Sequence, residues 1–121
     1  MDRSPERGPS RALALEIADV LTDTPASDTR VIDIAALTPI ADFFVLCSGE
    51  NERQLRAISR DVADTLASRK RRPQRTEGSA ASGWILIDYG DVVVHIFAMD
   101  QRAFYRLDEL WAEAPTILAI Q

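Results

Sequence analysis

The chain has 121 residues and carries 14 Lys and Arg against 19 Asp and Glu, which gives a net charge of −5 and an isoelectric point near 4.8. This length forms one domain, and a single Cys excludes an intrachain disulfide and a cysteine-ligated zinc site. The acidic balance argues against a protein whose whole surface binds nucleic acid. Because no apolar run reaches the roughly 18–20 residues of a membrane span, and no secretory signal is apparent, we expect a cytoplasmic protein.

The first half of the chain predicts a helix, two strands and a longer helix. Residues 1–9 hold two prolines and a glycine and predict a flexible N-terminal arm, whereas the helical spacing that starts at Ser10 predicts the first helix. The β-branched stretch 31–34 and the apolar run 43–47 predict two strands, the second buried on both faces. A capping box at 51–54 then begins the second helix. Its buried stripe is Leu55, Ile58, Val62 and Leu66.

The second half predicts a flexible connection and a β-hairpin. The basic run 69–75 and the Gly- and Ser-rich stretch after it are typical of a flexible connection. Two strand-like runs, 84–89 and 92–97, are joined by Gly90 and Asp91. This pair indicates a two-residue hairpin turn, because glycine adopts a positive φ without steric penalty.

A last helix follows the hairpin, with Asp100 as its cap and Pro115 beyond its end. Its apolar positions are Phe104, Leu107, Leu110 and Trp111. The predicted order is therefore α-β-β-α-β-β-α. We expect a single α/β domain of the α+β kind over residues 10–115, followed by an apolar tail, 116–121, to which no element is assigned.

The two-residue turn fixes which side chains of the hairpin share a face. One face is suited to pack under helices, and it holds Ile85, Ile87, Tyr89, Val92, Val94 and Ile96. The other face pairs Trp84 with Phe97, Leu86 with His95, and Asp88 with Val93. A core rarely holds an Asp beside a His, and a solvated face rarely gathers aromatic groups. The mixed face therefore indicates a partner-binding surface, unless the arm, the tail or a second copy of the chain covers it.

Cys47 and His95 are the one thiol and the one imidazole available for nucleophilic catalysis. Such a pair must be in contact, with the thiol near a cation or a helix N-terminus. Cys47 lies at the end of a strand just before a helix, but cysteines of this kind are usually buried and only pack. The pattern favours packing over catalysis.

Carboxylates near strand ends raise the alternative of a metal-dependent nucleotidyltransferase; they are Asp33, Asp42, Asp88 and Asp91. That chemistry needs two or three carboxylates around a magnesium ion and a phosphate. Ser48-Gly49 before a helix resembles the entry to such a site, but one glycine does not make a phosphate-binding loop. Roles in turns and caps are favoured, and we expect no metal, no cofactor and no enzyme activity.

The basic run 69–75 supplies five of the 14 cations of the chain and contains no acid. These cations either contact RNA phosphates or form a solvated linker. The rest of the chain carries twice the negative charge of the whole, which suits a basic protein as partner.

Three ordered motifs cover residues 10–113 and carry a family resemblance. The first is 38–49 (TPIADFFVLCSG), followed by Arg53, Gln54, Ala57 and Ile58. The second is Glu77-Gly78, followed by 84–97 (WILIDYGDVVVHIF). The third is Phe104-Tyr105, Leu107 and Leu110-Trp111. Together they resemble the Iojap family, the ribosomal silencing factors.

The resemblance implies a mixed sheet with helices, similar to nucleotidyltransferases but without their catalytic carboxylates. It implies that the chain binds the fourteenth protein of the large ribosomal subunit and obstructs joining of the small subunit, which represses translation. Organellar relatives act in assembly of the large subunit, and members are often homodimers. Whether the run from Arg69 to Arg75 contacts ribosomal RNA or is a solvated linker stays open.

The resemblance also implies which residues bind the partner. The family's binding residues correspond to Trp84, Leu86, Asp88 and Tyr89 in this chain. The hairpin register agrees on the first three but places Tyr89 on the core face. The mixed face adds two residues, so the expected partner-binding set is Trp84, Leu86, Asp88, Tyr89, His95 and Phe97.

Overall fold

The computed structural model describes residues 4–121, apart from the side chains of residues 4–6, 104, 105, 107 and 110. The helices are α1 (Ser4–Leu21), α2 (Glu52–Ser68), α3 (Met99–Tyr105) and α4 (Leu107–Leu110). The strands are β1 (Ser27–Asp33), β2 (Phe43–Gly49), β3 (Arg75–Ser79), β4 (Trp84–Asp88), β5 (Val92–Ala98) and β6 (Thr116–Ile120).

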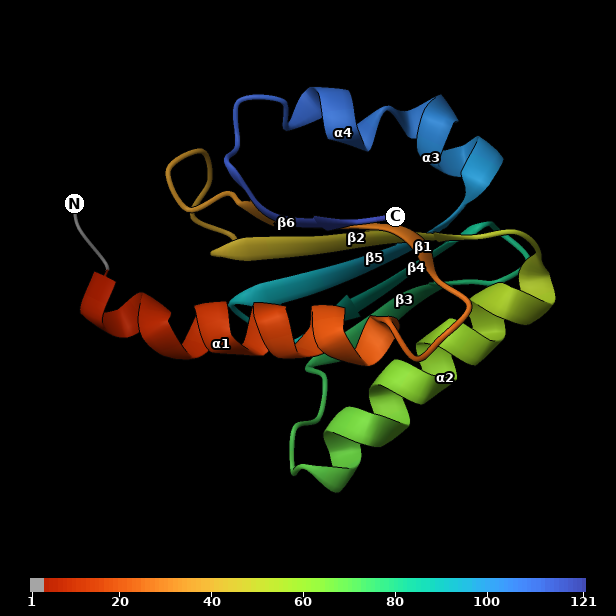
Figure 1. Cartoon of the computed structure of the whole chain (residues 1–121), viewed down its shortest axis with the longest axis horizontal. Helices are drawn as coiled ribbons and strands as arrows, with labels where there is room; N and C mark the ends of the chain where they lie inside the picture. The colour runs from red at the N-terminus through yellow and green to blue at the C-terminus, as the bar shows by residue number, and fades with distance from the viewer. Residues whose placement is uncertain (1–3) are drawn as a thin grey trace.

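All six strands form one sheet in the order β3-β4-β5-β2-β1-β6. The central strands β2 and β5 are parallel, and every other neighbouring pair is antiparallel. Helices α1 and α2 lie against one face of the sheet, and α3 and α4 lie on the other (Figure 1). The expectation of one α+β domain with a mixed sheet is confirmed, whereas the likeness to nucleotidyltransferases stays a prediction.

The face under α1 and α2, called here the helix-covered face, holds the main core. Fully buried side chains of α1 and α2 meet the inward side chains of β2, β4 and β5, among them Ile17, Leu21, Leu55, Ile58, Ile87 and Ile96. Asn51 caps α2 by accepting a hydrogen bond from the Gln54 amide at 2.8 Å, as the capping box predicts. All seven residues of β2 are buried, so the prediction of a strand buried on both faces is also confirmed.

The N-terminal segment differs from the flexible arm that its composition predicts. Helix α1 begins at Ser4 and not at Ser10, and residues 1–3 lie outside the described residues. The Arg7 guanidinium pairs with Asp33 and lies 5.0 Å from the Phe43 ring, and Ser10 Oγ donates to Asp42 Oδ2 at 2.9 Å. These contacts with β1 and β2 stabilise the first turns of the helix, whose composition alone disfavours them.

Both edges of the sheet are strands that the sequence pattern does not predict. The expected connection contains β3, which pairs with β4 although all five of its residues are exposed. The apolar tail contains β6, which pairs with β1. The predicted last helix is divided into α3 and α4 at Arg106, whose φ is +52°. The side chains of Phe104, Leu107 and Leu110 lie outside the described residues, so the prediction that they pack as apolar positions of this helix stays a prediction.

The second face of the sheet is partly covered by the segment from α3 to Ala114. Beneath this segment, Phe44, Leu46 and Phe97 form a smaller apolar cluster with Ile32, Ile34 and Val93. The Trp111 ring packs edge-on against Phe44, with 5.3 Å between the ring centroids. The cover lies over β1, β2 and β5.

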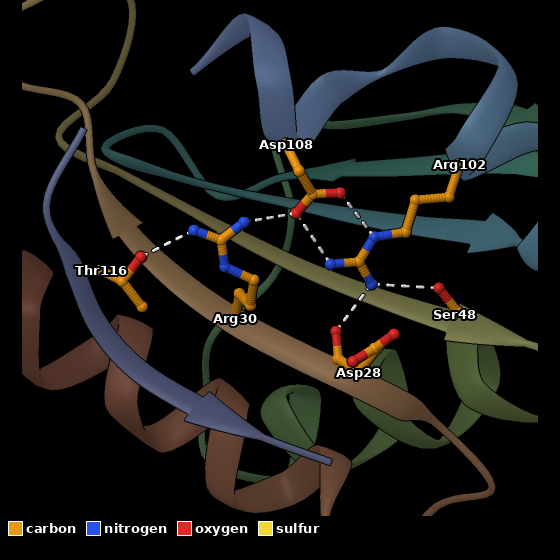
Figure 2. Close-up of polar contacts among 6 residues, drawn as sticks. All are labelled: Asp28, Arg30, Ser48, Arg102, Asp108 and Thr116. Atoms are coloured by element: carbon orange, nitrogen blue, oxygen red, sulfur yellow. Dashed lines mark hydrogen bonds and ion pairs between the residues drawn. The ribbon is translucent and has the colours of Figure 1, made fainter. Parts of the chain in front are cut away.

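A network of charged side chains holds the cover on the sheet (Figure 2). The Arg102 guanidinium of α3 donates two hydrogen bonds to Asp108 at 2.9 and 3.0 Å, and others to Ser48 Oγ and the Asp28 carbonyl at 3.0 and 2.6 Å. Arg30 of β1 donates to the same Asp108 carboxylate at 2.6 Å. Burial disfavours the charged form of Arg102, but the hydrogen bonds and charge of Asp108 outweigh it and raise the Arg102 pKa. The hydrogen bond from Arg102 lowers the pKa of Asp108.

Replacing Asp108 with Asn removes the negative charge that two arginines share. Because Arg102 is almost fully buried, we expect the free energy of unfolding to fall by about 2–3 kcal/mol, measured by urea denaturation. Asp61→Asn is the matched control, since Asp61 lies in an exposed pair with Arg60 at 4.0 Å, and such pairs contribute about 0–1 kcal/mol. An equal loss in both variants would contradict a stabilising role of the network.

Candidate partner-binding surface

The cover leaves the part of the second face over β3 and β4 open. We call this part the open face and define it by Arg75, Glu77, Trp84, Leu86 and Asp88. The β3–β4 pairing places Glu77 opposite Leu86 and Arg75 opposite Asp88, so these side chains share one face. Trp84 and Leu86 are half-buried, while Glu77 and Arg75 are exposed. The open face therefore combines a central aromatic and aliphatic pair with charged neighbours.

A hollow of 230 Å³ lies on the open face, lined by Glu77, Gly78, Ser82, Trp84 and Leu86. Gly78 makes it possible for β3 to approach β4 here. Its φ is +79°, and a Cβ atom at this position would stand 2.0 Å from the Trp84 carbonyl oxygen. The sequence did not identify Glu77 and Ser82 as members of the site, because β3 was not predicted. Gly78 and Gly83, on either side of 79–82, were the available signal of a further hairpin.

The Trp84 indole is fixed from beneath by two buried rings. It stacks on Phe97 with 4.8 Å between ring centroids, and its Nε1 donates to His95 Nδ1 at 3.2 Å. Phe97 is fully buried and His95 is 5% exposed. Both were expected to bind the partner, but in this conformation they lie under the surface. Their contribution is to hold Trp84, because a side chain that is already immobilised loses less entropy on binding.

His95 is neutral in the folded protein. Burial lowers its pKa from 6.5 to about 4. Because its Nδ1 accepts the hydrogen bond from Trp84, the proton of the neutral ring is on Nε2. The Phe44 ring packs edge-on against the imidazole at 4.6 Å, so His95 links the open face to the covered cluster.

The remaining two expected residues have different positions. Asp88 lies at the edge of the open face, where it accepts hydrogen bonds from the Gly90 amide at 2.7 Å and from Arg75 Nε at 3.2 Å. Tyr89 packs against the core of the helix-covered face, as the hairpin register predicts, and burial raises its pKa to about 12. The register itself is confirmed, with Trp84 opposite Phe97 and Leu86 opposite His95.

The Cys47 thiol cannot act with His95. Cys47 is fully buried in the core of the helix-covered face, while His95 contacts Trp84 and Phe44 on the second face. Burial raises the Cys47 pKa to about 12, which keeps the thiol protonated at neutral pH. The reading of Cys47 as a packing residue is confirmed.

The four carboxylates of the alternative function have different contacts. Asp33 pairs with Arg7, Asp42 accepts from Ser10, and Asp88 pairs with Arg75. Asp91 is exposed in the hairpin turn, and its carbonyl accepts from the Asp42 and Phe43 amides at 2.8 and 3.1 Å. Among the described residues, no three His, Cys, Asp or Glu side chains are grouped as metal ligands.

The basic run is partly neutralised by acids of the chain itself. Arg69 and Arg71 lie 2.6 and 3.8 Å from the Glu16 carboxylate of α1, and Arg75 lies 2.8 Å from Glu77. A contact of this run with RNA therefore stays a prediction. In the part of the chain that the structure describes, no helix combines the length and the apolarity needed to cross a membrane.

The depressed pKa of His95 makes stability depend on pH. In the unfolded chain His95 is protonated below about pH 6.5, whereas in the folded protein it is protonated only below about pH 4. We therefore expect the free energy of unfolding to fall as the pH drops through this window. At about 1.4 kcal/mol per pKa unit, the full loss is on the order of 3 kcal/mol. Urea denaturation from about pH 7.5 to about pH 4.5 should show this loss in wild type and not in His95→Gln. If the free energy of unfolding depends on pH in the same way in both proteins, His95 is not the cause of the loss.

Comparison with known proteins gives the family. The family model described as "Ribosomal silencing factor during starvation" matches residues 7–121. The chain is 37% identical over 99 residues to the ribosomal silencing factor RsfS of Halalkalibacterium halodurans, covering 82% of this chain and 85% of that protein. It is 33% identical to the chloroplastic protein Iojap of Arabidopsis thaliana over 89% of this chain and 45% of that protein.

Relatives with lower sequence identity point to the same family. The mouse protein named "Mitochondrial assembly of ribosomal large subunit protein 1" is 29% identical over 78% of this chain and 43% of its own length. A crystal structure of a protein from Chromobacterium violaceum superimposes with a TM-score of 0.80 at 26% identity, covering 84% of this chain and 85% of that one. These relatives are named as silencing factors and as an assembly protein, and not as enzymes. This chain belongs to the family of ribosomal silencing factors.

Proposed function

We propose that this protein represses translation by binding the large ribosomal subunit through the fourteenth protein of that subunit, and that it thereby blocks joining of the small subunit. The proposal includes a role in assembly of the large subunit, because the mouse relative is named for that process. We expect the protein to act in the cytoplasm, where ribosomes are assembled and used.

The open face is the observation that carries this proposal. Aromatic side chains held in place by their own protein are the residues that contribute most to binding, often about 2 kcal/mol or more each. Trp84 has this character, since Phe97 and His95 immobilise it, and Leu86 lies beside it on the same strand. The carboxylates of Glu77 and Asp88 border the pair, and because Arg75, which pairs with both, neutralises only one charge, the open face stays net negative and suits a basic ribosomal protein.

Repression of this kind needs no reaction. A protein bound at the surface where two subunits meet excludes the second subunit by occupying its space. The nucleotidyltransferase alternative is not favoured, because Asp33, Asp42 and Asp88 each serve a different contact and do not converge.

Truncating the open face should release the protein from large subunits. We expect Trp84→Ala to bind about 30-fold more weakly than wild type, and Glu77→Lys to weaken binding by placing a cation opposite a basic partner. Cosedimentation with purified large subunits measures both. Ile40→Ala is the control, because Ile40 is a large exposed apolar side chain, 67% exposed, in the β1–β2 loop.

Thermal unfolding of each variant checks that the loss comes from the surface and not from the fold, since Trp84 also packs on Phe97. If Trp84→Ala and Glu77→Lys sediment as well as Ile40→Ala, the open face is not the docking site. Failure of the wild type to sediment would contradict the proposed function itself.

We also propose that the protein forms a homodimer through the open face, where the cover leaves the apolar pair Trp84 and Leu86 accessible beside a hollow. Two copies would then compete with the ribosome for the same surface. We expect repression per protein molecule to rise on dilution in a subunit-joining assay, and light scattering to show that Trp84→Ala shifts the protein toward monomers. A dimer unaffected by Trp84→Ala would place the interface elsewhere.

A further inference from the structure

Half of the cations of the chain lie in one segment of 20 residues. Residues 53–72 contain seven of the 14 Lys and Arg and only two acids, Asp61 and Asp64. This segment is therefore strongly positive, although the whole chain carries −5. It consists of α2 without its first residue, Glu52, and of the start of the connection to β3. Helix α2 itself balances three arginines with Glu52, Asp61 and Asp64, so the surplus positive charge comes from residues 69–72.

The arginines of α2 gather on its exposed side. The buried stripe of the helix is Leu55, Ile58, Val62 and Leu66, and Arg53, Arg56 and Arg60 are exposed on the opposite side. Residues three or four apart on a helix lie about 5–6 Å from each other, so the three guanidinium groups form a row. We call this row the arginine face.

Two of these arginines border a groove between α2 and β4. Arg56 and Arg60 line it together with Ser59, Ala63 and Ile85, and its volume is 340 Å³. Arg56 lies 3.5 Å from Glu52 with 62% of its side chain exposed, and Arg60 lies 4.0 Å from Asp61 with 68% exposed. Exposed pairs at this distance contribute little, so these guanidinium groups can turn to an external anion at small cost.

The arginine face and the open face are on opposite sides of the sheet. Helix α2 lies against the helix-covered face, while the open face shares its side of the sheet with α3 and α4 (Figure 1). At the C-terminal end of α2 the chain continues into Lys70 and Arg72, which are exposed. The open face thus offers an apolar pair with two acids beside Arg75, and the exposed side of α2 offers three guanidinium groups.

We propose that the arginine face, continued by Lys70 and Arg72, binds the phosphate backbone of RNA. Guanidinium groups donate paired hydrogen bonds that match phosphate oxygens, and exposed cations in a row match a chain of regularly spaced phosphates. The described residues of this face include no aromatic side chain on which a base could stack, so the contact is independent of sequence.

This inference rests on the proposed function, because the acidic remainder of the chain weakens any binding to RNA alone. Once the open face has docked on a ribosomal protein, the arginine face meets neighbouring RNA at a high effective concentration. The two contacts then reinforce each other.

Salt dependence of cosedimentation with large subunits tests the inference. For the double variant Arg56→Gln, Arg60→Gln, we expect binding about tenfold weaker at low salt, and a plot of log affinity against log salt that is shallower by about 1.5. Glutamine is a good helix former, so α2 should persist. Arg106→Gln is the control, since Arg106 is 74% exposed on the other side of the sheet and pairs with Glu109 at 3.9 Å.

The salt dependence also distinguishes an RNA partner from a protein partner at the arginine face. A double variant that behaves like Arg106→Gln would overturn the inference, and so would weaker binding with an unchanged salt slope, which would point to a protein partner at this face. A separate titration with an RNA duplex of about 20 base pairs at low salt distinguishes the two proposals. If the wild type fails to bind subunits, the proposed function fails, and loss of duplex binding in the double variant alone still supports the arginine face.

Discussion

The register of the β4–β5 hairpin is the constraint on which the other features of the sheet depend. Gly90 adopts a φ of +93°, and the Tyr89 amide bonds to the Val92 carbonyl at 2.9 Å, so the turn has no freedom to slip. A shift by one residue would exchange the two faces and expose the core. The register therefore places Ile87 and Ile96 under the helices and, by the same step, brings the Trp84 ring onto Phe97 on the other side.

The second face shows how one sheet surface serves two purposes. Over β1, β2 and β5 the cover closes it, and Arg102 and Asp108 of the cover fix its position through hydrogen bonds with Ser48, the Asp28 carbonyl and Arg30 of the sheet. Over β3 and β4 the cover is absent and Trp84 remains half-buried. The buried His95 and Phe97 lie at the boundary, so the same rings complete the covered cluster and support the open face. If the open face binds the partner as proposed, these two side chains link stability to binding.

Local signals predicted the hairpin, its register, the buried strand β2 and the cap of α2, because each depends on residues close together in the chain. Distant contacts decided the rest. Residues 4–9 are helical where Pro and Gly suggested an arm, since Arg7 and Ser10 bond to the sheet. Strand β6 is apolar but too short to assign without its partner β1, and β3 is polar and exposed, so only Gly78 and Gly83 indicated its hairpin with β4. For the same reason the sequence identified Trp84 and Leu86 as a surface but could not place Phe97 beneath it.

Under the proposed function, the charge distribution suits an acidic protein to a particle rich in RNA. A uniformly acidic surface would be repelled by phosphates at every approach, and a uniformly basic one would bind RNA anywhere. Here the three arginines of α2 and the four cations of residues 69–72 lie apart from Glu77 and Asp88, which border the open face. Only one orientation brings acids to a basic protein and cations to neighbouring RNA together. Separation of charge across the sheet therefore gives orientation, and steric exclusion of a second subunit depends on orientation as much as on affinity.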